Sequence, residues 1–185
     1  ITAQAFDHFI TEAGIKEKIK KIAYSINSEN TNELNKASKE IRSLIENAEI
    51  SQELESEIKE SYSILSGGSE INVRGVNADA LSILKNSQEP IFVSVRSSAT
   101  TEDLADASFA GQQESFLNVK GNESLIFYIK KCFSSLYTPR AIYYRIKKGF
   151  SEVEALLAVV VQKMIDSEKS GVVFSHDPIS QNDSI

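Results

Sequence analysis

Apolar residues recur three or four positions apart through residues 1–66, with lysine and glutamate between them. This spacing is typical of amphipathic helices that bury one face and expose the other. Three of the helical stretches follow a residue whose side chain can accept hydrogen bonds from the first free backbone N–H groups. The residues expected to cap helices are Thr2, Thr31 and Ser51. Gly14 is placed to end the first helix, and Gly67-Gly68 to end the whole helical run.

The second half of the chain follows a different pattern. The run Ile91–Val95 is rich in β-branched and aromatic residues and predicts a buried strand. Further along, Asn122 can cap one helix, and Thr138 followed by Pro139 is typical of the start of another. The expected elements are a strand over 91–95, helices over 122–137 and 138–149, and strands over 155–165 and 170–175. Elements in this order predict an α+β fold rather than regular βαβ alternation.

These patterns divide the chain into an N-terminal helical segment (1–68), a connector (69–90) and a lobe (91–185). The connector has no functional interpretation. Because the first residue is Ile1 rather than methionine and the last residues have the composition of a loop, we expect the chain to be a piece of a longer protein, with the lobe cut at both ends.

Composition narrows the function classes. Hydrophobic residues make up 41% of the chain and charged residues 25%, the balance of a globular protein, and there is no long apolar run or signal-peptide pattern. We therefore expect a cytoplasmic protein without a membrane partner. The net charge of -6 argues against a nucleic-acid surface. Charge is uneven, however: residues 120–150 hold seven bases and one acid, so a small anionic ligand could bind there.

The stretch "VSVRSSATTEDLADASFAGQQESFLNV" (93–119) carries the candidate chemistry. Arg96 is expected at the end of the strand, where its planar guanidinium can bind two phosphate oxygens at once. Hydroxyl groups follow it, and Gly111 permits a close approach of the backbone to a ligand. The hydroxyl residues are Ser97, Ser98, Thr100 and Thr101. On chemistry alone, a phosphate site and an ordinary hydroxyl-rich turn both remain open.

The acidic residues, the cysteine and the histidines give a weaker indication of function. Four acids in the same stretch fit either a magnesium-bearing ligand or a solvated loop; they are Glu102, Asp103, Asp106 and Glu114. Cys132 lies on an apolar helical stripe and is expected in the core. His8 and His176 are expected to be structural or surface residues, and no spacing of His and Cys predicts a metal site.

The stretch 93–119 closely resembles the nucleotide-binding domain of phosphoenolpyruvate synthases. Rifamycin phosphotransferases share it with some variation, and pyruvate phosphate dikinases more distantly. Further similar motifs follow in the same order: "TPRAIYYR", "VVVQKMI" and "SGVVFSHDP". The opening "TAQAFDHFITEAGI" resembles the helix after the family's lysine-bearing segment. The resemblance covers nearly the whole chain and is weakest over 67–90.

The resemblance implies an ATP-grasp-like lobe, with a mixed or antiparallel sheet packed on helices, and ATP as the bound nucleotide. It also implies a reaction in which ATP phosphorylates a histidine on a separate domain, and that phosphohistidine then phosphorylates pyruvate at a third domain while water takes the other phosphate. The expected partners are thus the phosphohistidine and pyruvate-binding domains of the parent chain. The expected enzyme is a phosphotransferase with paired acceptors, a pyruvate, water dikinase.

The resemblance also assigns site residues. Arg96 would contact the phosphates, and Arg140 falls where the family has an arginine near the site, although a helix-surface ion pair explains it equally well. The residues 97–113 would fold over the phosphates; the nucleotide-binding residues among them are Ser97, Ser98, Thr100, Thr101, Gly111 and Gln112. Gln162, Lys163 and Met164 would lie beside the adenine. No metal ligand is assigned, because the magnesium ligands and the phosphate-binding lysine are expected outside this chain.

Two alternatives remain open. The same architecture serves a rifamycin-type antibiotic phosphotransferase, and a non-catalytic helical interaction module with a polar loop would have no nucleotide site. Because only one wall of an ATP site is expected here, we expect residues 1–185 alone to be catalytically inactive.

Overall fold

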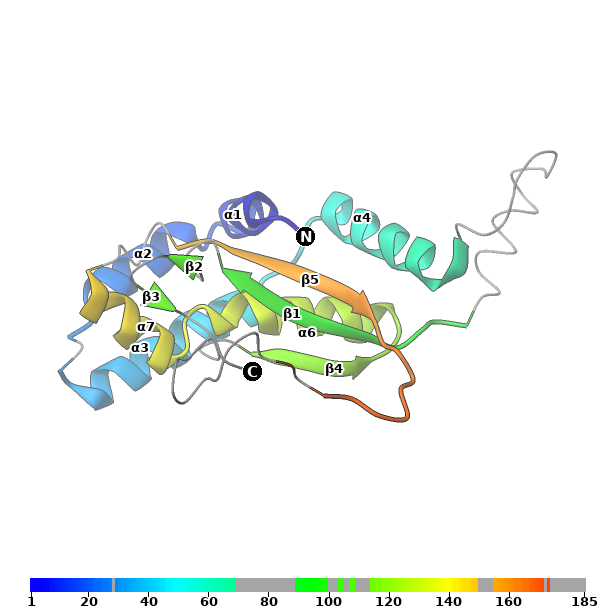
Figure 1. Ribbon diagram of the computed structural model, residues 1–185. Coiled ribbons are helices and arrows are strands. Elements are labelled where there is room, and N and C mark those ends of the chain that lie inside the picture. The colour runs from blue at the N-terminus through cyan, green and yellow to red at the C-terminus, as the bar shows by residue number, and fades with distance from the viewer. Residues whose placement is uncertain are drawn as a thin grey trace.

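The computed structural model describes most of the chain. The described residues are 1–27, 29–68, 89–99, 103–104, 107–108, 114–149, 155–171 and 173. Helices and an antiparallel sheet form the fold, with the sheet lying in front of a long helix, α6 (Figure 1). The predicted α+β fold class is confirmed.

The N-terminal helices occupy the positions that the apolar spacing predicts. They are α1 (Ala3–Glu12), α2 (Lys16–Tyr24), α3 (Thr31–Asn47) and α4 (Gln52–Ser63). A π-helical turn over Ile64–Gly68 follows α4, and within it Gly67 has a φ of 121°. That conformation is costly for a residue with a Cβ, so Gly67 interrupts the helix at the predicted place. Residues 69–88 lie outside the described part of the chain, so the predicted end of the helical run stays a prediction.

The caps of these helices are only partly as predicted. The Thr2 side chain accepts a hydrogen bond from the N–H of Ala5, which confirms the first cap. The prediction for α3 is wrong: Asn30 caps it by accepting from the N–H groups of Asn32 and Glu33, and Thr31 is its first helical residue. Ser51 stands at the cap position of α4 but its side chain makes no capping hydrogen bond.

A three-stranded antiparallel sheet has the strand order β4-β1-β5, with β1 (Val93–Ala99) in the centre. Its neighbours are β4 (Ser115–Val119) and β5 (Leu157–Lys163). The short strands β2 (Asp103–Leu104) and β3 (Ala107–Ser108) pair with each other. The predicted end of the first strand is wrong, since β1 continues through Arg96 to Ala99, and β4 was not predicted at all.

The later elements agree better with the sequence. Helices α6 (Asn122–Ser135) and α7 (Pro139–Lys148) are present. Thr138 caps α7 by accepting from the N–H of Ala141, as predicted. Asn122 is the first residue of α6 and Gly121 holds the cap position, so that cap prediction is wrong. The strand predicted over 155–165 is β5, shorter at both ends.

The last predicted strand, over 170–175, falls mostly outside the described residues. Ser170, Gly171 and Val173 are described and are not in a strand. Within the described residues, no helix combines the length and the apolar composition needed to cross a membrane.

A hydrophobic core joins the helices to one face of the sheet. The rings of Phe6 and Phe9 on α1 lie 4.8 and 5.8 Å from the ring of Phe133 on α6. Ile41 and Ile45 of α3 are completely buried in the same cluster. Burial of each such side chain contributes about 1.5–3 kcal/mol before chain entropy is subtracted. The N-terminal helices and the sheet thus share one core, which fixes the sheet against α6.

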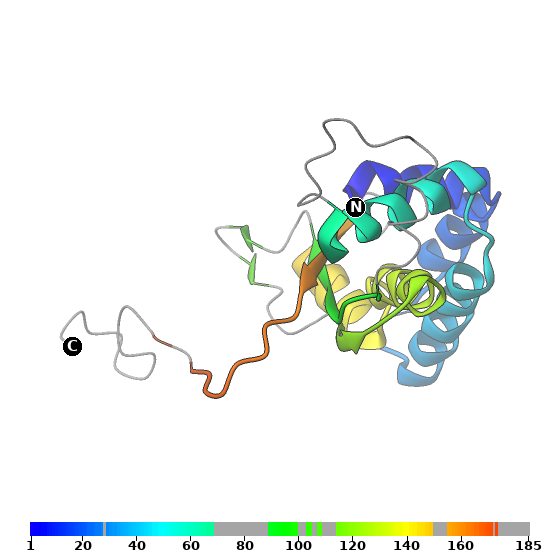
Figure 2. The same cartoon turned by 90° about the vertical axis from the view of Figure 1, so that its right-hand side faces the viewer.

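The helices cover only one side of the sheet. Helix α6 packs on all three strands and α1 packs on β5. Figure 2, which views the sheet from its end, shows α1, α3, α4 and α6 gathered on the same side of it. The opposite side of the sheet is therefore where exposed side chains of the strands are available to a ligand.

Candidate functional site

The uncovered side of the sheet carries a set of exposed side chains that we call the open face. Its members are Arg96 and Ser98 of β1, Ser115 and Leu117 of β4, and Val160 and Gln162 of β5. Side chains alternate between the two faces along a strand, so Val93 and Val95 point toward α6 and Arg96 points away. Leu117 is 63% exposed and Val160 47% exposed, so the open face presents apolar as well as polar surface.

Arg96 lies at the centre of the open face. It occupies the middle strand, opposite Ser115 on one side and Val160 on the other. The side chain is exposed, and no acidic residue in the described part of the chain forms an ion pair with it. The backbone of Arg96 is held by two neighbouring strands, and its exposed guanidinium offers a planar set of donors on the open face. This arrangement suits a ligand with paired anionic oxygens.

The serines around Arg96 divide between the two faces. Ser98 is two residues from Arg96, shares the open face and is exposed. Ser97 lies opposite Val159 and alternates to the other face, where it is half-buried. Ser94, on the side of Arg96, is buried, and its hydroxyl donates to the carbonyl of Gln162 at 3.4 Å. The sheet thus brings Ser98 together with Arg96 and directs Ser97 away from it.

Four of the predicted nucleotide-binding residues lie outside the described residues. They are Thr100, Thr101, Gly111 and Gln112. Their proposed role therefore stays a prediction.

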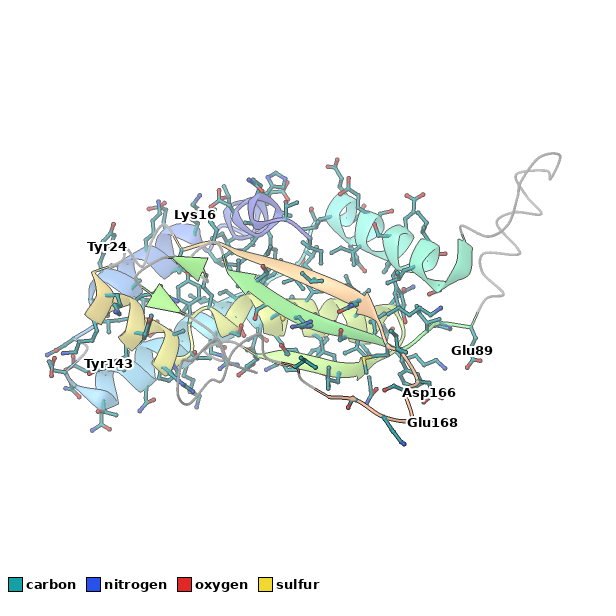
Figure 3. All side chains as sticks on the ribbon, in the orientation of Figure 1. Lys16, Tyr24, Glu89, Tyr143, Asp166 and Glu168 are labelled. Carbon is teal, nitrogen blue, oxygen red and sulfur yellow. The ribbon has the colours of Figure 1, made fainter. Side chains whose placement is uncertain are left out.

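The predicted adenine-binding residues lie at the end of β5. Gln162 is exposed on the open face, and Lys163 is the last residue of the strand. Met164 follows; it is half-buried, and its N–H donates to the carbonyl of Phe92 at 2.9 Å. Glu89, Asp166 and Glu168 lie at the same end of the sheet (Figure 3). Because the N–H of Met164 is already bonded within the protein, it is not free to donate to a ligand.

Arg140 comes from a different element than the sheet. It follows Pro139 in the first turn of α7 and is exposed. The alternative explanation for this residue was an ion pair on the helix surface, but the described acidic residues provide no such pair. A contact of Arg140 with a ligand stays a prediction.

Glu114 has a partner that sequence reasoning missed. One nitrogen of Arg42 on α3, Nη2, lies 3.1 Å from each carboxylate oxygen of Glu114. The predicted alternatives for this acid were a magnesium-bearing ligand or a solvated loop. Instead its side chain contacts a helix that lies 72 residues earlier in the chain.

Arg145 is a second basic residue whose position was not predicted. Its side chain is completely buried, and its Cζ lies 5.7 Å from the centre of the Tyr137 ring. Although the sequence places Arg145 in the basic stretch 120–150, it offers no indication that this guanidinium is buried while Arg140 is exposed. The positive charge that this stretch exposes to a surface ligand is therefore smaller than its sequence suggests.

The remaining candidate residues have structural roles. Cys132 is fully buried, as predicted, and burial raises the pKa of its thiol to about 12, with a smaller contribution from the nearby charge of Glu114. His8 is exposed on α1 and its Nε2 lies 3.2 Å from Glu12, as expected for a surface residue. His176 lies outside the described residues.

An apolar groove of about 410 Å³ lies on the helix side, away from the open face. Residues from α1, α4 and β5 line it, among them Leu54, Ile58 and Val161. None of the open-face residues contributes to its lining. This groove and the exposed Arg96 are therefore at different places.

Comparison with known proteins shows the family of the chain. Residues 1–185 match the model of one family, the pyruvate phosphate dikinase AMP/ATP-binding domain. The chain belongs to this AMP/ATP-binding domain family. The match covers the N-terminal helices as well as the sheet, in agreement with the shared core.

Relatives of this AMP/ATP-binding domain carry a common name. A probable phosphoenolpyruvate synthase of Methanocaldococcus jannaschii is 45% identical over 182 residues, which are 98% of this chain and 14% of that protein. One of Archaeoglobus fulgidus is 44% identical over 180 residues, 97% of this chain and 22% of that protein. The phosphoenolpyruvate synthase of Aquifex aeolicus is 40% identical over 179 residues, 96% of this chain and 19% of that protein.

These comparisons confirm the predicted resemblance to the nucleotide-binding domain of phosphoenolpyruvate synthases. This AMP/ATP-binding domain spans between about a seventh and just over a fifth of the length of these relatives. Most of the length of each relative therefore lies outside the region that matches this chain.

Proposed function

We propose that this domain binds ATP on the open face of its sheet, with the guanidinium of Arg96 holding the phosphates. The observation that carries the proposal is the position of Arg96: exposed in the central strand, on the side that the helices leave uncovered. An ion pair with a protein carboxylate would have to break before a nucleotide could bind. The described residues present no such competitor to Arg96.

The neighbours of Arg96 support binding of a nucleotide rather than of a free phosphate. Ser98 can donate a hydroxyl hydrogen bond on the same face. Leu117 and Val160 provide exposed apolar surface beside the charge, and a nucleotide offers both an anionic and an apolar part. Toward the end of β5, Gln162, Lys163 and the side chain of Met164 would lie against the adenine. Arg140 would approach the phosphates from the first turn of α7.

The parent reaction would be that of a phosphoenolpyruvate synthase. ATP would first phosphorylate a histidine of another domain, and that group would then pass to pyruvate at a third domain while water takes the other phosphate. The balance is ATP, pyruvate and water giving AMP, phosphoenolpyruvate and phosphate. The names of the relatives favour this acceptor over a rifamycin-type antibiotic. By itself the domain would be inactive, because it holds only part of the site.

Magnesium is not assigned to any residue of this domain. Within the described residues no three His, Cys, Asp or Glu side chains are grouped to hold a metal ion, and the carboxylate of Glu114 is bonded to Arg42. We propose that the ligands of the magnesium ion lie elsewhere in the parent protein.

The test is the substitution Arg96→Ala in the full-length protein. Pyruvate-dependent release of AMP and phosphate from ATP would be measured, together with the affinity for ATP. Loss of a charge-assisted phosphate contact costs about 1.5–3 kcal/mol, so kcat/KM for ATP should fall by about 10- to 150-fold. Lys36→Ala, an exposed lysine on α3, is the control and should leave kcat/KM unchanged. Unaltered use of ATP by the Arg96→Ala protein would instead favour the interaction-module interpretation.

A further inference from the structure

We infer that Arg42 is a positioning residue of the nucleotide site: by holding Glu114 it fixes the start of β4 and thereby the surroundings of Arg96. This inference rests on the proposed function, since it concerns the same open face. It adds to that site a residue of the helical layer whose ion pairs are with Glu46 and Glu114, and neither of these belongs to the open face.

The contact between Arg42 and Glu114 has the geometry of a specific interaction. A single nitrogen, Nη2, is 3.1 Å from both carboxylate oxygens, and the Arg42 side chain is only 23% exposed. Partial burial reduces the screening that makes most surface ion pairs weak. The pair thus links the middle of α3 to the residue that immediately precedes β4.

Glu114 is also held from a second element. Its backbone carbonyl accepts a hydrogen bond from the thiol of Cys132 on α6, with a sulfur–oxygen distance of 3.5 Å. The side chain and the backbone of one residue are therefore attached to α3 and α6 respectively. Two attachments to different helices leave Glu114 little freedom to rotate or to shift along the strand direction.

Arg42 is in turn held by its own helix. Its Nε lies 3.6 Å from Glu46 one turn along α3, and the carboxylate of Glu46 accepts hydrogen bonds from Lys131 and Ser134 of α6. Burial is the largest single effect on the pKa of Glu46 and would raise it, but the hydrogen bonds and charges of Lys131, Ser134 and Arg42 together lower it. Glu46 is thus a stable anion beside Arg42. Its charge helps to orient the Arg42 guanidinium toward Glu114.

The consequence for Arg96 comes through the strand pairing. Ser115 follows Glu114 directly and lies opposite Arg96 in the ladder between β4 and β1. Further along, the register of this ladder shifts between Val95 and Val93, and Asn118 has a φ of 58°. A bulged edge strand can slip unless something fixes its register. The contact at Glu114 fixes the regular end of β4, next to Arg96.

The experiment measures nucleotide binding in the full-length protein. Arg42→Gln, Glu114→Gln and the double variant are compared with the wild type by calorimetric titration with MgATP and by kcat and KM for ATP. Each single substitution should weaken ATP binding by about 3- to 10-fold, the range of a partly buried ion pair, and change kcat by less than about 2-fold. Because the two residues act as one unit, the double variant should bind no more weakly than the single ones. Arg42→Lys keeps the charge and should recover part of the affinity.

The controls separate this inference from the proposed function. Lys36→Ala changes an exposed charge on the same helix and should bind ATP as the wild type does. If the wild type does not bind MgATP, the proposed function and the inference fail together. If Arg96→Ala loses affinity while the Arg42 and Glu114 variants keep it, only the inference fails. Additive effects of the two substitutions, or a lower melting temperature with unchanged affinity in Arg42→Gln, would likewise overturn the inference.

Discussion

The hydroxyl of Tyr62, near the end of α4, donates a hydrogen bond to the carbonyl of Ile91, two residues before β1. The same oxygen accepts a hydrogen bond from the N–H of Gly121 at 3.1 Å, at the cap position of α6. One buried phenol thus connects the last N-terminal helix, the entry to the central strand and the start of the helix that supports the sheet. Tyr62 therefore fixes the start of β1, the strand that carries Arg96, in addition to the strand pairing with β4 and β5.

Tyr62→Phe should destabilise the domain while leaving its core packing intact. The substitution removes both hydrogen bonds but keeps the ring, and it leaves the carbonyl of Ile91 and the N–H of Gly121 without this partner. We expect the free energy of unfolding to fall by about 1–3 kcal/mol. Urea unfolding measures this change. Tyr24→Phe is the matched control, because the Tyr24 side chain is 75% exposed, and it should change stability by less than about 0.5 kcal/mol.

Thr138→Ala should destabilise the start of α7. The threonine side chain accepts a hydrogen bond from the N–H of Ala141 at 3.2 Å, and removal of such a cap costs about 1 kcal/mol. Ser51→Ala is a sharp comparison, since Ser51 holds the same position at α4 but makes no capping hydrogen bond. Thermal unfolding of the two variants should therefore show a clear loss only for Thr138→Ala. Equal losses would mean that the cap geometry of Thr138 contributes nothing of its own.

The sequence predicts the helices of this fold well and its strands less well. Helical spacing is a local property, so α1 to α4 could be placed from the apolar positions alone. The choice of cap is less certain where two suitable residues adjoin: Asn30 takes the extended conformation before α3, and Thr31 becomes helical. Adjacent Asn and Thr are both good caps, so nothing in the local sequence distinguishes them.

The strands depend on partners that are distant in sequence. β1 extends past Arg96 because β5 pairs with it along its whole length, from Val93 opposite Lys163 to Ala99 opposite Leu157. β4 was not predicted, because Val119 is its only fully buried residue and Leu117 is exposed. Without a clear alternation of apolar and polar residues, such a strand resembles a loop in the sequence.

The same limit applies to the candidate site. The resemblance indicated Arg96, but the local sequence could not show that its guanidinium would be exposed on the open face while that of Arg145 would be buried. Nor could it connect Glu114 with Arg42, because that ion pair joins residues 72 positions apart. Spacing rules apply to neighbours within one helix or strand, and this contact exists only once the sheet has packed on the helices.

Glu46→Gln should change how stability depends on pH. The pKa of Glu46 in the folded protein is lower than its ordinary value of 4.5, so folding favours the ionised carboxylate. Its contribution to stability is fully present above about pH 4.5 and is lost as the pH falls through the lower folded-state pKa. At pH 7 the variant should be less stable than the wild type by about 1–2 kcal/mol.

The measurement is urea unfolding of both proteins from pH 7 down to pH 3. The difference in unfolding free energy between them should be constant near neutral pH and shrink below about pH 4.5. Glu40→Gln, which alters an exposed acid on the same helix, serves as the control and should follow the wild type at every pH. A difference that grows toward acid pH would contradict the lowered pKa.

Cys132 should be unreactive in the folded protein. Burial raises the pKa of its thiol to about 12, so almost none of the reactive thiolate exists at pH 8, and its sulfur is also covered by the surrounding core. We expect alkylation by iodoacetamide at pH 8 to be undetectable under native conditions and complete in concentrated urea. Because the chain contains a single cysteine, mass spectrometry of the intact protein assigns any adduct without ambiguity. Rapid stoichiometric labelling of the native protein would show that α6 and the start of β4 separate readily, and the attachment of Glu114 to Cys132 would then not hold the strand in place.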